Sequence, residues 1–314
     1  GYGFLYFKII NYNPIKINIG YIGLGGIFIL ILISYLTNFF LQHNIYHNLF
    51  ILFFGIIAFF KFLKHYYNEN SFFCKLSILV FSVLFISILI FKNHDDFPYY
   101  HFPYTIYLVE NNLIYGVGNL NHGFRTPSSI FYLNSLFYLP LIKHFSFTFS
   151  AVYILGFANL ILLDKIFKIY NLNLGAIKKN KYNFINYLFL LTFIFINIFF
   201  YRIAEHGTDR SAQILVILLV IEILLFLNIR KNKSVSPTLY LLVGIIISLK
   251  SFYILYLLFI IPIVKYFWSN KKKIFIFKKI FFNINFIPLL LIIIFTLFTF
   301  FFNTGCFVYP ISFT

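Results

Sequence analysis

Long runs of apolar residues, broken by short polar connectors, are the feature that most constrains how this chain can fold. A helix needs about 20 predominantly apolar residues to cross the hydrocarbon core of a bilayer. The runs show no period-two alternation, so their length and pattern favour helices over strands. The candidate spans cover residues 21–41, 49–64, 74–92, 149–167, 184–201, 211–229, 237–249, 251–268 and 284–302.

The composition agrees with an integral membrane protein. Of the 314 residues, 61% are hydrophobic and only 11% are charged. Soluble domains carry about 25% charged residues. We therefore predict an all-α fold, a polytopic transmembrane helical bundle of about eight to nine spans, of which 49–64 and 237–249 are short.

The lysines predict how the bundle is oriented, because basic residues concentrate in cytoplasmic connectors. If the amino terminus is cytoplasmic, one simple alternation places the lysine-rich connectors 61–75, 165–181, 230–233 and 265–279 on the same inner side. The outer connectors are then 42–48, 93–148, 201–210, the break near Lys250, and 303–314. We predict an integral protein of the inner (cytoplasmic) membrane whose polar loop faces the periplasm.

The formal net charge of +17 does not indicate nucleic-acid binding. Only four of the 25 basic residues are arginine, and the excess lysine accompanies abundant Ile, Phe, Asn and Tyr. These residue types share A/T-rich codons, and the lysines sit in short connectors rather than along a groove that could follow a phosphate backbone. We expect membrane lipids as partners and no nucleic acid.

Three segments follow from this pattern. Residues 1–92 form an amino-terminal segment of three spans, residues 93–148 form the outer loop, and residues 149–314 form the remaining spans. Within the loop, residues 97–113 and 128–139 have the mixed aromatic and polar pattern of interfacial helices, joined by a turn-rich connector. Since the sequence contains no methionine, we expect the chain to be a fragment of a longer protein.

An acidic pair, Asp95 and Asp96, directly follows the third predicted span. Two adjacent carboxylates at the end of a membrane span cost free energy unless water solvates them, a cation pairs with them or they serve a function. They could simply face water at a helix end, or one could act as a general base on an acceptor hydroxyl. With His94 and His101 nearby they could also bind a metal, and a carboxylate-rich site suits Mg²⁺ or Mn²⁺.

Other charged residues of the outer connectors could complete a site. Asp209 stands where the sixth span begins, where it could be an N-cap or could face the loop acids. Arg125 and Arg210 lie in outer connectors and could contact a phosphate. Lys250 interrupts an apolar segment, either in an outward turn or as a further phosphate ligand.

The acidic pair at the start of a large outer loop, followed by interfacial helices and further spans, resembles the GT-C superfamily of membrane glycosyltransferases. That resemblance implies a loop acid as catalytic base and a polyprenyl-phosphate-linked sugar as donor. The chain also resembles a group of bacterial polytopic membrane proteins. The segments that carry this second resemblance are DDFPYYHFP, YGVGNLNHGFRTPSS, GTDRSAQILV, SLKSFYILYL and NTGCFVYP.

We therefore expect an integral membrane glycosyltransferase that moves a sugar from a polyprenyl-phosphate donor to a lipid-linked or envelope acceptor. Asp95 is the expected base, Asp96 and Asp209 would position substrate or a Mg²⁺ or Mn²⁺ ion, and the leaving phosphate would meet the basic residues Arg125, Arg210 and Lys250. The alternatives are a lipid-linked saccharide flippase or other transporter, and a non-catalytic membrane protein. Transport needs polar residues along the spans, and the spans offer few beyond Glu222.

Overall fold

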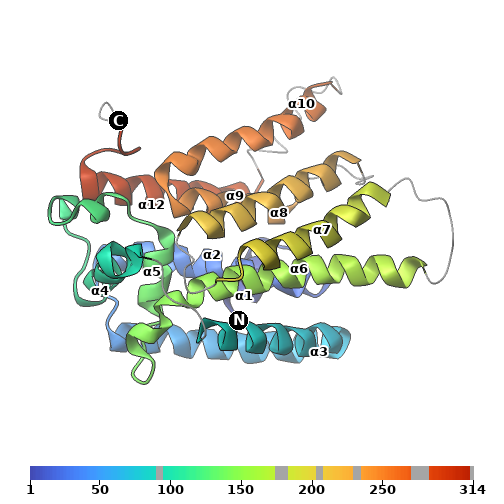
Figure 1. Cartoon of the computed structure of the whole chain (residues 1–314), viewed down its shortest axis with the longest axis horizontal. Coiled ribbons are helices and arrows are strands. Elements are labelled where there is room, and N and C mark those ends of the chain that lie inside the picture. Colours follow the sequence, from blue (N-terminus) through green and yellow to red (C-terminus); the bar gives the residue numbers. More distant parts are fainter. Residues whose placement is uncertain (90–94, 174–182, 203–207, 229–234, 270–282, 312–314) are drawn as a thin grey trace.

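The computed structural model of the chain is a bundle of helices that run roughly along one direction (Figure 1). The structure describes residues 1–89, 95–173, 183–202, 208–228, 235–269 and 283–311. Helices account for all the regular secondary structure of these residues, and they contain no strand. The all-helical fold that the apolar runs predict is therefore confirmed for this part of the chain.

Most of the described residues belong to α-helices of very different lengths. The α-helices are α1 (Tyr2–Ile9), α2 (Ile19–Asn38), α3 (Ile45–Ile88), α4 (Phe102–Glu110), α5 (Ser129–Leu136), α6 (Phe149–Asn173), α7 (Asn183–Phe199), α8 (Thr208–Asn228), α9 (Pro237–Leu249), α10 (Ile261–Ser269) and α12 (Phe286–Thr304). The short 3₁₀ and π segments are η1 (Pro14–Lys16), η2 (Phe97–His101), η3 (Val117–Asn119), η4 (His122–Arg125), η5 (Lys143–Thr148) and η7 (Ser251–Ile260).

Among the described residues, six helical segments are long and apolar enough to cross a membrane. These six are Ile19–Asn38, Ile45–Ile88, Lys143–Lys168, Thr208–Asn228, Ser251–Trp268 and Phe286–Thr304. Two shorter apolar helices, Tyr187–Phe199 and Pro237–Leu249, accompany them. The structure therefore agrees with an integral membrane protein.

Helix α3 bends back on itself at Asn70, whose backbone is not helical (φ −134°, ψ 36°). The first arm reaches the beginning of α2, where the Tyr66 hydroxyl donates to the Ile17 carbonyl at 3.2 Å. The second arm runs antiparallel to α6, because the ring of Phe72 lies 5.3 Å from that of Phe167 and the ring of Phe85 lies 4.9 Å from that of Phe149. The predicted lysine-rich connector 61–75 is therefore helical on both sides of a break at Asn70.

Glycines at the beginning of α2 allow two neighbours to approach its backbone closely. A Cβ atom on Gly3 of α1 would lie 1.6 Å from the carbonyl oxygen of Ile22. A Cβ atom on Gly23 would lie 2.1 Å from the Phe157 ring of α6. The glycine-rich run 20–26 thus lets α1 and α6 pack directly against α2.

Helix α5 lies inside the protein rather than at a bilayer surface. All eight of its residues are buried, and it packs against α2, α4, α6 and α9. Asn48 holds its end in place by donating to the carbonyl oxygens of Ser135 at 2.8 Å and Tyr138 at 3.0 Å. The Ser135 hydroxyl also lies 2.6 Å from Nδ1 of His43. Because its polar groups find such partners, this helix can be buried.

His43 should make the stability of the protein depend on pH. Burial, with a smaller contribution from the charge of His47, lowers the pKa of His43 to about 3, whereas a histidine in an unfolded chain titrates near about 6.5. The unfolded state therefore binds the extra proton below about pH 6.5, so stability present above that pH is lost as the pH falls. Lowering the pH from about 7.5 to about 5 should decrease the free energy of unfolding by about 2 kcal/mol through this residue.

Unfolding of the purified protein in detergent at both pH values checks this expectation. His43→Gln should remove this part of the pH dependence. His65→Gln serves as the control, because His65 is an exposed histidine on α3. An unchanged pH dependence in His43→Gln would contradict the assignment.

Candidate functional site

An ion pair joins the beginning of α8 to the break between α9 and η7. Nζ of Lys250 lies 2.6 Å from Oδ1 of Asp209. Asp209 is in the first turn of α8, and Lys250 has an extended backbone (φ −154°, ψ 144°) directly after α9. A helix dipole favours an acid at its amino end and a base at its carboxyl end, so both positions suit their charges.

Tyr253 is a third member of this contact. It stands three residues after Lys250 in the 3₁₀-helix η7, and its hydroxyl donates to Oδ1 of Asp209. The side chain of Lys250 is only 19% exposed, whereas that of Asp209 is 56% exposed. The carboxylate of Asp209 is thus fixed by two donors while one side of it still faces outward.

Segment η2 brings one of the loop acids, Asp96, to the same place. Asp96 directly precedes η2, and its carboxylate interacts with the Tyr100 hydroxyl. Burial and the nearby negative charges of Asp96 and Asp209 raise the pKa of Tyr100 to about 12. Tyr100 therefore keeps its proton, and it stands within electrostatic range of both carboxylates. The buried His101 acts electrostatically on Asp209 as well.

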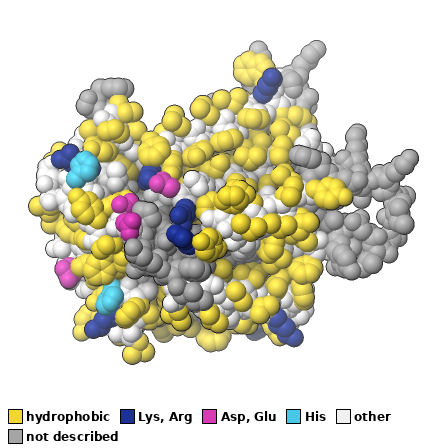
Figure 2. Space-filling view, in the orientation of Figure 1, with side chains coloured by type: hydrophobic (Ala, Val, Ile, Leu, Met, Phe, Trp, Pro, Cys, Tyr) yellow, Lys and Arg dark blue, Asp and Glu magenta, His cyan; other side chains and the backbone are white. Residues whose placement is uncertain are grey.

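We call these residues the charged cluster, which comprises Asp96, Tyr100, Asp209, Lys250 and Tyr253. They come from three segments that are far apart in the sequence. All three segments meet at the end of the bundle where α4 and α5 lie, which we call the loop end (Figure 1). Figure 2 shows acidic and basic side chains close together on this part of the visible face.

The other predicted site residues are placed differently. Asp95 is exposed beside Asp96, and Arg210 is half-buried next to Asp209 on α8. Arg125 donates from Nε to the Gly118 carbonyl at 3.1 Å, which ties η4 to η3. His94 lies outside the described residues.

The metal site that the sequence predicts at Asp95 and Asp96 stays a prediction. Among the described residues, no three His, Cys, Asp or Glu side chains gather as a metal would require. A magnesium ion is commonly held by one or two carboxylates with water and substrate oxygens, and Asp95 and Asp96 are the carboxylates predicted to hold it.

Sequence reasoning missed two residues of the cluster, Tyr100 and Tyr253. Tyr253 could have been found from its spacing. Residues three apart in a 3₁₀-helix lie on the same face, and position 253 is three residues after Lys250. Glu222, by contrast, is far from the cluster. It is buried in the carboxyl-terminal half of α8, accepting hydrogen bonds from Tyr21 at 2.9 Å and Thr238 at 3.4 Å, residues at the beginnings of α2 and α9.

The ion pair of Asp209 and Lys250 should contribute measurably to stability. Exposed pairs contribute about 0.2–1 kcal/mol, and this pair is more buried on the lysine side. A double-mutant cycle with Asp209→Ala and Lys250→Met should give a coupling of about 1–2 kcal/mol. Unfolding of the four proteins in detergent provides the measurement. Strictly additive effects would show that the two side chains do not interact.

Comparisons with known proteins identify a family but no activity. A family model described as "Domain of unknown function (DUF8201)" matches residues 1–314. No curated protein and no solved structure matches the chain. The function must therefore be argued from the charged cluster.

Proposed function

The chain belongs to the DUF8201 family, and from its charged cluster we propose that it is an integral membrane glycosyltransferase. It would move a sugar from a polyprenyl-phosphate donor to a lipid-linked or envelope acceptor. One observation carries the proposal: carboxylates and a lysine from distant segments meet at one end of an apolar bundle. Sugar transfer requires both kinds of group, because a base must accept the proton of the acceptor and a cation must stabilise the leaving phosphate.

We propose that the loop end faces the periplasm and that the amino terminus is cytoplasmic. The bend of α3 at Asn70 lies at the opposite end of the bundle from the cluster, and Lys64 and Lys75 flank it. Basic residues at that end agree with a cytoplasmic location. If the two arms of α3 are counted separately and α7 and α9 are added, the six long apolar segments become nine, which supports our proposal of eight to nine spans. A GT-C-like arrangement in the inner membrane is part of the same proposal.

The proposed chemistry is a single displacement with inversion. The acceptor hydroxyl oxygen attacks the anomeric carbon, and its proton passes to a carboxylate. The bond from that carbon to the phosphate oxygen breaks, and the phosphate leaves with the electron pair. Within the acidic pair, we favour Asp96 as the base over Asp95, because Tyr100 interacts with Asp96 and lies within electrostatic range of Asp209 as well.

Lys250 is the proposed ligand of the leaving phosphate. An ammonium group has three donors, so Lys250 can keep its ion pair with Asp209 and also donate a hydrogen bond to a phosphate oxygen. Arg210 is a second candidate, because it is half-buried in the first turn of α8 and the amino end of a helix attracts anions. Arg125, which is tied to η3, is the weakest of the three predicted phosphate ligands.

A divalent cation held by Asp95 and Asp96 is the alternative role for the acidic pair. Mg²⁺ or Mn²⁺ there would bind the donor phosphate instead of leaving Asp96 free as a base. Transfer that continues in EDTA would assign the pair to proton transfer. Transfer that stops in EDTA and returns with Mg²⁺ would assign it to the metal.

Sugar transfer from a defined donor tests the proposal. The purified protein is incubated with polyprenyl phosphate that carries a radiolabelled hexose and with an extract of envelope lipids as acceptors. We expect labelled product from the wild-type protein and at least about a hundredfold less from Lys250→Met, the range seen when one transition-state donor is removed. Movement of the intact donor across proteoliposomes without transfer would instead support the flippase alternative.

A further inference from the structure

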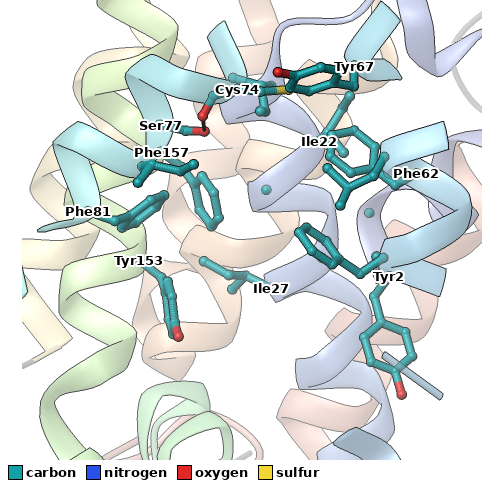
Figure 3. Close-up of a pocket in the computed structure, with 18 of the residues that line it drawn as sticks. Tyr2, Ile22, Ile27, Phe62, Tyr67, Cys74, Ser77, Phe81, Tyr153 and Phe157 are labelled. Carbon is teal, nitrogen blue, oxygen red and sulfur yellow. Dashed lines mark hydrogen bonds between the residues drawn. The ribbon is translucent and has the colours of Figure 1, made fainter. Parts of the chain in front are cut away.

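A large apolar cavity lies on a different group of helices. Its volume is about 1160 Å³, and α1, α2, both arms of α3 and α6 enclose it. Figure 3 shows Phe81 and Phe157 on one wall, with ring centroids 5.0 Å apart, and Phe62 and Ile22 on the opposite wall. The volume exceeds the 300–1,000 Å³ that is usual for small-molecule sites.

The cavity extends along the direction of the helices. Lys64 and Lys75 line one end, near the bend of α3, and Phe85 and Phe137 line the other. Ten residues of α3 separate Lys75 from Phe85, which corresponds to roughly 15 Å of helix. That length is about half the hydrocarbon thickness of a bilayer, or one leaflet.

The basic side chains that line the cavity are all at its end near the bend of α3. Lys64 and Lys75 are both exposed, and the described lining contains no aspartate or glutamate. Glu69 stands on the bend between the lysines and is exposed outside the lining. Basic pockets between transmembrane helices on the cytoplasmic side bind anionic lipid headgroups.

We propose that this cavity holds a membrane phospholipid with an anionic headgroup. The phosphate contacts Lys64 and Lys75, and the acyl chains lie between the aromatic walls of α3 and α6. Each methylene group removed from water contributes about 0.8 kcal/mol, but in a bilayer that gain is already present. The preference for one lipid headgroup over another therefore depends on the two lysines. The lipid itself occupies the space between the bent α3 and the helices α2 and α6.

This site is independent of the proposed sugar transfer. Its basic end lies away from the charged cluster, and none of the cluster residues lines it. The lipid-binding proposal can therefore be tested without measuring enzymatic activity. A result that contradicts one of the two proposals does not bear on the other.

Native mass spectrometry of the purified protein provides the test. The protein in detergent is titrated with phosphatidylglycerol, which is anionic, and with phosphatidylethanolamine, which is zwitterionic. We expect tighter binding of phosphatidylglycerol to the wild-type protein. Lys64→Gln/Lys75→Gln should weaken that binding about thirtyfold, or roughly fivefold for each lysine, with little change for phosphatidylethanolamine. Lys16→Gln/Lys265→Gln is the matched control, since both lysines are exposed and outside the lining.

A second variant tests the position of the acyl chains. Ser82 is an exposed residue of the lining, so Ser82→Trp should fill part of the cavity without disturbing the core. It should lower the occupancy of both lipids severalfold. Equal binding of the two lipids to the wild-type protein, or unchanged phosphatidylglycerol binding in the Lys64/Lys75 variant, would overturn the proposal. So would a lipid-free dimer that buries the cavity.

Discussion

Asp96→Asn is expected to slow sugar transfer by about 10²–10⁴-fold, the range by which a positioned general base accelerates a reaction. The change keeps the shape of the side chain and its contact with Tyr100, but an amide does not accept the proton of the acceptor. Steady-state transfer of a radiolabelled hexose from polyprenyl phosphate gives the measurement. Donor binding should change little, so the loss should appear in kcat more than in KM.

Asp95→Asn is the matched control for this variant. It removes the same charge one residue away, on a side chain that is exposed. We expect less than about a tenfold loss, because a charge that faces solvent is largely screened. The reverse result, with Asp95 essential and Asp96 dispensable, would move the base to Asp95. Full activity in both variants would reject a loop acid as the base.

Gly3→Ala is expected to destabilise the protein by about 3 kcal/mol, at the upper end of the usual cost of overpacking. The added Cβ would lie 1.6 Å from the Ile22 carbonyl oxygen, which is backbone and cannot rotate away. Helix α1 must therefore move off α2. Unfolding in detergent measures the effect.

Gly26→Ala tests the same interface with little steric conflict. Its Cβ would lie 3.3 Å from the Gly3 nitrogen, a contact that small shifts can relieve. Alanine also gains about 1 kcal/mol over glycine in a helix interior. We expect a change of less than about 1 kcal/mol. Equal destabilisation by the two variants would contradict the packing of α1 on α2.

The helices were predictable because their signal is local. A run such as 284–302 is long enough and apolar enough to specify a helix by itself, and α12 covers Phe286–Thr304. The break at Lys250 was predictable for the same reason, since one charged residue interrupts an apolar segment. The reversal of α3 at Asn70 was predictable as well, because it falls inside the connector 61–75 between two predicted spans. The helical structure of that connector was not predicted, because its polar residues looked like a loop.

The charged cluster was predictable as a set of residues but not as a set of contacts. Asp209 and Lys250 stood out because charges are rare in this chain. Their separation of 2.6 Å depends on how α8 and α9 pack, and no local pattern encodes that. The burial of α5 was missed for a related reason. Its serines and asparagine looked suited to an interface, but inside the protein their side chains have partners in His43, Ser248 and the Ser150 amide.

The location of a bound lipid phosphate tests the central claim most directly. A cryo-electron microscopy map of the protein with added polyprenyl monophosphate would show it. The account predicts phosphate density at the loop end, within hydrogen-bonding distance of Lys250 and facing Asp96. Phosphate density elsewhere, with solvent alone beside Lys250 at saturating ligand, would contradict it.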